Sequence, residues 1–234
     1  MKNSISFRLW GRYALFTDPI TKVGGEKCTY HLPTYEAIKG VLKSIYWKPT
    51  LIWHVDRVRV IKPLRTQTKG TKPLNWGGGN TLAYYTFLHD VEYQVEAHFE
   101  WNEHRPELTR DRIDGKHYAI AKRMLDKGGR QDIFLGTRDC QGYVEPCVFG
   151  EGDGAYDDID ELGFGLMFHS FGYPDETGNN ELSSRFWHGK MKNGVIEYPH
   201  VSDCPVSRHV REMTAKHFEL EQNLQGVEQT ETCS

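Results

Sequence analysis

Residues 34–61 read TYEAIKGVLKSIYWKPTLIWHVDRVRVI, which predicts a helix followed by a strand. Apolar residues at spacings of three and four indicate the helix, which Thr34 caps and Pro49 ends, with Tyr46 in its last turn. Alternating side chains indicate the strand over Leu51–Ile61. One side of this strand is expected to carry Ile52, His54, Asp56, Val58 and Val60, and the other Trp53, Val55, Arg57 and Arg59.

The flanking segments extend this pair into a longer series. Residues 11–33 read as a loop, and 62–80 are basic and glycine-rich, which is typical of a mobile loop or a long hairpin. Further strands are expected over 4–10 and 90–101 and from Ile133, and a second helix from near Asp114. The order strand, helix, strand, strand, helix, strand is the split βαβ plan of ferredoxin-like (RRM) folds, with both helices on one face of an antiparallel sheet.

That topology places two distant segments at one end of the domain. Strands one and three are antiparallel neighbours in this plan, so the helices that follow them also run antiparallel. The C-terminus of the first helix then lies beside the N-terminus of the second. We therefore expect Tyr46 to lie near Lys116 and His117, which fall in the first turn of the second helix.

A change in composition after residue 150 indicates a second, smaller unit. Residues 151–161 are acidic and glycine-rich, as in a connector, and Lys192-Asn193-Gly194 is typical of a hairpin turn. Strands are expected over 162–173, 185–190 and 195–198. The sequence thus predicts an α+β chain with a ferredoxin-like domain (1–150), a small antiparallel β-sheet domain (151–222) and a disordered tail (223–234).

The net charge of −3 conceals a strong asymmetry along the chain. Residues 1–76 hold 14 Lys and Arg against 4 Asp and Glu, whereas residues 77–234 hold 15 against 28. A basic region attracts phosphates through counterion release, which favours a nucleic-acid partner. Charges clustered on ordinary solvated surfaces would give the same counts, so both interpretations stay open on charge alone.

Several classes of function find no support in the sequence. No apolar run reaches the roughly 18 to 20 residues of a membrane helix, and a cytoplasmic protein is expected. The five cysteines lack a C-x-x-C pair, which favours reduced thiols over a zinc or redox site. The carboxylates between Asp153 and Glu161 lack the spacing of a calcium loop, and the glycine-rich segments lack the Lys-Ser/Thr of a P-loop. We expect neither a metal nor another cofactor.

Metal-free RNA cleavage needs a base for the 2′-hydroxyl proton, an acid for the leaving 5′-oxygen and a cation for the phosphate. His117 titrates near neutrality and suits either proton role, while Lys116 at a helix N-terminus suits the phosphate. Tyr46, a residue type with a reference pKa of about 10, more readily acts as an acid or as an orienting partner unless a neighbouring Lys lowers that pKa. Which of Tyr46 and His117 is base and which is acid stays open, and each residue taken singly is as typical of core or surface.

Aromatic rings beside basic residues suit single-stranded RNA, because rings stack on bases while cations follow the backbone. The same rings are as readily part of a core. The candidate RNA-binding residues are Arg8, Arg12, Lys43, Arg57, Arg59, Lys69, Lys72, Trp76 and Arg138.

Four segments, taken in order, resemble one family. They are Phe7-x-x-x-Gly11-x-x-Ala14-x-Phe16, Leu32-Pro33-Thr34-Tyr35-Glu36-Ala37-Ile38-Lys39-Gly40, Lys116-His117-Tyr118 and Phe134-Leu135-Gly136-Thr137-Arg138-Asp139-Cys140. Over residues 4–205 the chain resembles the Cas five family of CRISPR-associated proteins, d subtype, of type I-C systems.

The resemblance implies an enzyme of antiviral defence in the repeat-associated (RAMP) superfamily, a metal-independent endoribonuclease. Such a protein cuts CRISPR precursor RNA at the base of the repeat hairpin by 2′-hydroxyl attack. It then stays on the 5′ handle of the crRNA as a subunit of a surveillance complex (Cascade), with backbone and large subunits as partners. The catalytic Tyr, Lys and His of the family correspond here to Tyr46, Lys116 and His117.

Two other hypotheses remain open from the sequence. The same patch would also suit a non-catalytic subunit that grips the crRNA handle. A nonspecific nucleic-acid-binding protein would need little more than the basic N-terminal third.

Overall fold

The computed structural model describes residues 3–217, so the tail predicted for 223–234 lies outside the described residues. The helices are α1 (Pro19–Val23), α2 (Tyr35–Ile45), the 3-10 helix η1 (Pro106–Asp111), α3 (Lys116–Asp126) and α4 (Pro174–Thr177). The strands are β1 (Ser4–Ala14), β2 (Leu51–Val60), β3 (Thr66–Thr71), β4 (Ala83–Trp101), β5 (Ile133–Phe134), β6 (Gln141–Pro146), β7 (Glu161–Gly172), β8 (Glu181–Lys192), β9 (Val195–Glu197) and β10 (Val206–Glu212).

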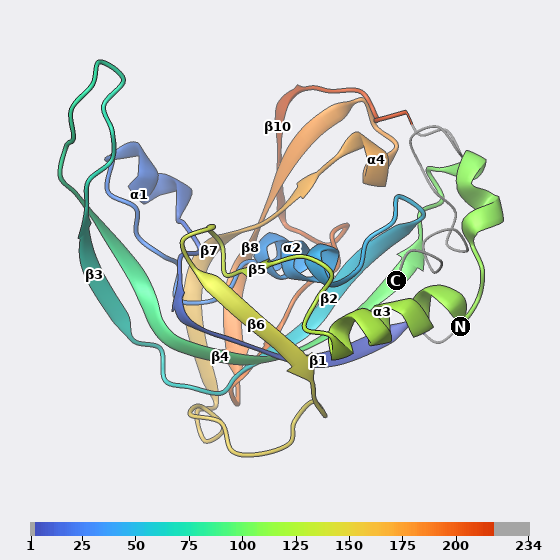
Figure 1. The fold of residues 1–234 in the computed structure, drawn as a ribbon, viewed down its shortest axis with the longest axis horizontal. Helices are drawn as coiled ribbons and strands as arrows, with labels where there is room; N and C mark the ends of the chain where they lie inside the picture. The colour runs from blue at the N-terminus through green and yellow to red at the C-terminus, as the bar shows by residue number, and fades with distance from the viewer. Residues whose placement is uncertain (1–2, 218–234) are drawn as a thin grey trace.

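The architecture is a mixed α/β fold built on one large antiparallel sheet. Its strand order is β10-β8-β9-β2-β4-β1-β6-β5, with β3 paired to β4 and β7 paired to β8. Figure 1 shows α2 near the centre of the molecule, α3 below and to the right of it, and the β3–β4 hairpin reaching away from the body of the molecule. The hairpin form of residues 62–80, one of the two predicted alternatives, is therefore the one observed.

The core lies where the central strands meet the helices. Phe7 in β1, Trp53 in β2 and Phe99 in β4 are fully buried and belong to one hydrophobic cluster. Leu42 and Ile45 of α2 belong to the same cluster, as the three- and four-residue spacing predicted. Burial of this apolar stripe, rather than helix propensity alone, is what holds α2 in place.

The alternation predicted for β2 is wrong beyond Val55. One extra residue stands between Val55 and Arg57 in the pairing of β2 with β4. This β-bulge exchanges the two sides of the strand, so Val58 and Val60 are buried in the core. A regular two-residue period contains no sign of where a bulge interrupts it.

The fourth strand of the predicted series is also displaced. The strand expected from Ile133 is the short β5, which pairs with β6, and it is β6 that pairs with β1. The chain reverses between them, since the Leu135 N–H donates to the Cys140 carbonyl at 2.8 Å. The first strand and the third strand are longer than predicted, and α1 lies in the segment expected to be a loop.

The C-terminal strands continue the same sheet through β9, which pairs with β2. The predicted turn after Lys192 joins β8 to β9, with positive φ angles at Asn193 and Gly194. Strand β10 was not predicted, because most of its residues are exposed and show no alternation. The division into domains at residue 150 stays a prediction.

Among residues 3–217, no helix has the length and apolar character that crossing a membrane requires.

Candidate active site

Tyr46 is fixed at the point where α2 ends. Thr34 caps the start of the helix by accepting the Ala37 N–H, and Tyr46 itself adopts extended backbone angles at its end. The Tyr46 N–H donates to the Leu42 carbonyl at 2.9 Å, and the Tyr46 carbonyl accepts from the Trp53 indole at 2.8 Å. Because both backbone groups are held, the phenol ring, only 3% exposed, has a defined direction.

His117, the second residue of α3, is fully buried. Its Nδ1 lies 2.9 Å from the Tyr46 hydroxyl oxygen, which is hydrogen-bonding distance. The imidazole ring packs against Trp101 of β4 in a T-shaped arrangement, with ring centroids 5.4 Å apart. The structure therefore brings Tyr46 and His117, which are 71 residues apart, into direct contact.

Lys116 opens α3 directly before His117 and is half-buried. Its positive charge acts on His117, where it is one of the causes that lower the pKa of the imidazole. The three residues expected to be catalytic therefore meet at one end of α2 and α3, within electrostatic reach of one another.

Three residues that the sequence reasoning missed complete this cluster: Lys48, Thr50 and Asp111. The Asp111 backbone carbonyl lies 2.5 Å from His117 Nε2, and the Thr50 hydroxyl donates to the Asp111 carboxylate at 2.6 Å. All three are buried, although two of them are charged residue types that are rarely buried. In the sequence, only their closeness to the predicted residues could have identified them. Lys48 and Thr50 follow Tyr46 closely, and Asp111 stands six residues before His117.

The electrostatics of the cluster favour a neutral His117. Burial is the largest cause of its lowered pKa, the charges of Lys48 and Lys116 lower it further, and Asp111 acts in the opposite direction. Burial also lowers the pKa of the Lys48 ammonium, against the attraction of Asp111. A neutral imidazole beside a phenol is able to accept a proton.

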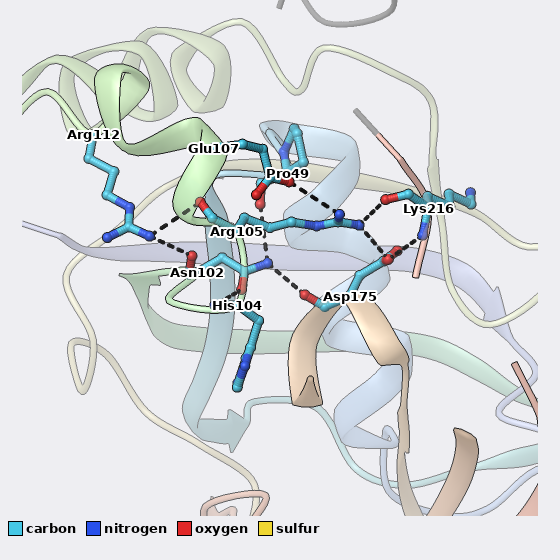
Figure 2. A network of polar contacts seen from close by, with 8 residues as sticks. All are labelled: Pro49, Asn102, His104, Arg105, Glu107, Arg112, Asp175 and Lys216. Carbon is cyan, nitrogen blue, oxygen red and sulfur yellow. Dashed lines mark hydrogen bonds and ion pairs between the residues drawn. The ribbon is translucent and has the colours of Figure 1, made fainter. Parts of the chain in front are cut away.

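A network around Arg105 holds the segment that carries Asp111 (Figure 2). Arg105 pairs with Asp175 at 2.6 Å and also donates to the Lys216 backbone carbonyl. The Asn102 amide donates to the carbonyls of Pro49 and Asp175, at 3.2 and 2.7 Å. These contacts tie η1 and the loop before it to the loop after Tyr46.

Four of the candidate RNA-binding residues are exposed. Trp76 is fully exposed at the tip of the β3–β4 hairpin, and Lys72 stands on the same hairpin. Arg12 lies over the Tyr13 ring and Arg138 over the Phe134 ring. Lys69, on β3, is half-buried with its ammonium 3.3 Å from the Tyr13 ring centroid, and it lowers the pKa of Tyr13.

The other four candidates contact carboxylates of the chain itself. Arg59 is buried and pairs with Asp157 at 2.5 Å, and it donates to the Gly152 carbonyl at 2.8 Å, which fixes the loop after residue 150. The remaining ion pairs are Arg8 with Glu92 and Glu145, Lys43 with Glu176, and Arg57 with Glu96. Part of the basic surplus near the N-terminus is therefore neutralised inside the molecule, and RNA contact by these residues stays a prediction.

Beside the cluster, a cavity of about 310 Å³ is lined by Lys43, Trp47, Pro49, Arg105 and Lys216, among others. Within the described part of the chain, no group of three or more His, Cys, Asp or Glu side chains is arranged to hold a metal ion.

Comparisons with known proteins agree on one family. A family model described as CRISPR-associated protein (Cas_Cas5), for Cas5d, matches residues 4–199. Two proteins named CRISPR pre-crRNA endoribonuclease Cas5d are each 28% identical to this chain. The one from Mannheimia succiniciproducens covers 85% of this chain and 96% of its own length, and the one from Thermus thermophilus covers 83% and 91%.

A solved structure described as a CRISPR-associated protein has the same fold. It superposes with a TM-score of 0.75 at 36% identity, over 88% of this chain and 96% of its own.

Proposed function

Because the chain belongs to the CRISPR-associated Cas5 family, in its d subtype, we propose that it is an endoribonuclease that cleaves CRISPR precursor RNA. The observation that carries this proposal is the 2.9 Å contact between the Tyr46 hydroxyl and His117 Nδ1, with Lys116 beside it. A family of pre-crRNA endoribonucleases and a phenol–imidazole–ammonium cluster point to the same chemistry.

The proposed reaction is metal-independent. The 2′-hydroxyl at the base of the repeat hairpin attacks the adjacent phosphorus, Tyr46 and His117 handle the protons, and Lys116 stabilises the extra negative charge. A cyclic phosphate and a free 5′-hydroxyl are the expected products, because the 2′-oxygen replaces the 5′-oxygen on phosphorus.

The exposed basic and aromatic residues are the proposed path of the RNA. Arg12, Lys72, Trp76 and Arg138 are accessible to a phosphate backbone or to a base. After cleavage the protein is proposed to keep the 5′ handle and to join backbone and large subunits in a type I-C surveillance complex.

The strand order β2-β4-β1-β6 supports a finer description of the fold. We interpret these four strands, with α2 and α3, as the ferredoxin-like unit expected from the sequence. The strands from β7 onward would then form the proposed small C-terminal sheet, joined to it through β9.

The proposal is tested by incubating the purified protein with repeat RNA in EDTA. We expect the wild type to make one discrete cut and His117→Ala to make none. His188 is an exposed histidine of β8, and His188→Ala is the control that should still cut. Replacing the 2′-hydroxyl at the cut position by hydrogen should prevent cleavage.

A different outcome would favour the second candidate function. Intact RNA that remains tightly bound would identify a non-catalytic subunit that grips the crRNA handle. Binding that ignores the repeat hairpin at moderate salt would instead indicate a nonspecific nucleic-acid-binding protein.

A further inference from the structure

Four residues of the cluster form a series of hydrogen bonds, called the relay below, in which Asp111 takes part with both its carboxylate and its backbone carbonyl. Thr50 donates to the Asp111 carboxylate at 2.6 Å, and the Asp111 backbone carbonyl contacts His117 Nε2 at 2.5 Å. His117 Nδ1 contacts the Tyr46 hydroxyl at 2.9 Å. The relay joins the loop after α2 to η1 and α3, and each of its members is at most 4% exposed.

The partners of His117 determine its tautomer. A carbonyl oxygen can only accept a hydrogen bond, so Nε2 must carry the hydrogen that meets Asp111. In a neutral imidazole the other nitrogen then has a lone pair. The Tyr46 hydroxyl must therefore donate to Nδ1, and the basic nitrogen of His117 faces Tyr46.

We propose that Asp111 is a positioning residue: its backbone carbonyl holds His117 in the Nε2–H tautomer and its carboxylate stabilises the imidazolium, so that Tyr46 rather than the imidazole takes the proton from the RNA. The inference rests on the proposed function and deepens it, because it orders Tyr46 and His117 along the path of one proton. Tyr46 is the group that touches the substrate, and His117 acts behind it.

The proton step balances without a further reactant. The 2′-hydroxyl gives its proton to the Tyr46 oxygen while the phenolic proton passes to His117 Nδ1, and the 2′-oxygen forms its bond to phosphorus. The bond from phosphorus to the 5′-oxygen breaks, and that oxygen takes a proton from water. His117 returns its proton to Tyr46, which releases one to solvent, so the relay ends as it began.

The carboxylate of Asp111 matters when His117 becomes positive. Its Oδ2 lies 3.9 Å from Nε2, close enough to stabilise an imidazolium that has almost no access to water. The other charges that face the ring are Lys48, from the loop after α2, and Lys116, from α3, and both oppose protonation. From β4 the neutral Trp101 packs against it, and from the end of α2 the neutral phenol of Tyr46.

The anchoring of η1 keeps Asp111 at this distance. Arg112 donates to the Asn102 carbonyl at 2.9 Å, and Arg105 is held by Asp175 (Figure 2). Arg112 also pairs with Glu103. A side chain positioned by packed neighbours retains its direction during a reaction.

The test compares Asp111→Asn with Asp114→Asn, an exposed aspartate three residues along the chain. Single-turnover cleavage of repeat RNA is measured from pH 5 to pH 9. We expect Asp111→Asn to cut the RNA about 10- to 100-fold more slowly. The acidic limb of its pH–rate profile should move to lower pH, because the imidazolium has lost a negative neighbour. Asp114→Asn should match the wild type in both respects.

A merely structural role would give a different result. Asp111→Asn would then lower the rate at every pH with the acidic limb unmoved, and the proposal would be overturned. If Asp111→Asn misfolds, Thr50→Val provides a second test. It removes the hydroxyl that donates to Asp111 and leaves the shape of the side chain nearly unchanged. Thr50→Val should slow cleavage by a smaller factor than Asp111→Asn. Thr50→Ser, which keeps the hydroxyl, should cleave at the wild-type rate.

A spectroscopic measurement separates this inference from the proposed function. Nitrogen-15 NMR of labelled protein reports the tautomer of each histidine, and the His117 signals are those lost in His117→Gln. We expect the Nε2–H form whether or not repeat RNA is cut. The Nδ1–H form would refute the relay even in an active enzyme, whereas an inactive wild type with the Nε2–H form would refute the proposed function alone.

Discussion

His98 and Asp56 form a partly exposed ion pair away from the site, in which His98 Nδ1 lies 2.8 Å from the carboxylate. The hydrogen bond to Asp56 is the largest cause of the raised pKa of His98. A histidine whose pKa rises on folding adds stability that is complete below the unfolded value of about 6.5 and is lost as the pH rises through the folded value.

Asp56→Asn should therefore destabilise the protein at acidic pH more than at alkaline pH. We expect a loss of about 0.5 to 1 kcal/mol in the free energy of unfolding at pH 5.5, a small value because solvent screens the pair. At pH 9 the loss should nearly vanish. Urea unfolding at the two pH values measures the difference, and the exposed Asp153→Asn is the control. An equal loss at both values would contradict the assignment.

At the residue scale, the sequence predicted only part of the candidate site. Tyr46, Lys116 and His117 were identified by residue type, by the topology and by the family resemblance. Asp111 was not, because its role depends on a backbone carbonyl and on the path of residues 102–115, neither of which has a motif. Arg59 was predicted to bind RNA, but the sequence contains no sign that Asp157 would reach it.

At the scale of elements, the turn after β5 leaves little space for a side chain at Gly136. Gly136 has a φ of 91°, and a Cβ added there would overlap the Leu15 carbonyl of the neighbouring chain segment. Gly150 has a φ of 88° but nothing within 4 Å of such a Cβ. The two glycines share a backbone conformation and differ in their surroundings.

Gly136→Ala and Gly150→Ala therefore separate backbone strain from steric overlap. Gly150→Ala should cost about 1 kcal/mol of unfolding free energy, the usual cost of a left-handed alanine. Gly136→Ala should cost about 3 kcal/mol or more, since the backbone must also move. Urea denaturation of both variants decides the comparison. Equal losses would mean that the segment around Leu15 shifts freely.

The elements that the sequence predicted best are those with a strong local pattern. The cap at Thr34 and the apolar stripe of α2 set its bounds within a few residues. The bulge after Val55 and the exposed strand β10 were missed, because long-range pairing determines them and local alternation does not.

At the scale of the whole molecule, the parts before and after residue 150 share contacts. The Tyr198 hydroxyl donates to the Pro33 carbonyl at 2.6 Å, and His169 stacks on Tyr35 with ring centroids 4.2 Å apart. Lys39 of α2 pairs with Glu176 of α4. Such contacts couple the stability of the two parts.

We therefore expect the two parts to unfold together. Far-ultraviolet circular dichroism and tryptophan fluorescence should give coincident transitions in urea. Trp187 is the only tryptophan after residue 150, so the difference in fluorescence between the wild type and Trp187→Phe reports the C-terminal part. A separate transition in that difference signal would show that the C-terminal strands unfold on their own.

The contact between Tyr46 and His117 also has a consequence for how the chain folds. It closes a loop of 71 residues and needs β2, β4 and the segment through η1 to be in place first. Contacts of such high sequence separation form late, because the entropy of closing a long loop must be overcome before they are gained. Ribonuclease activity regained during refolding would then report completion of the native topology, some time after the helices themselves have formed.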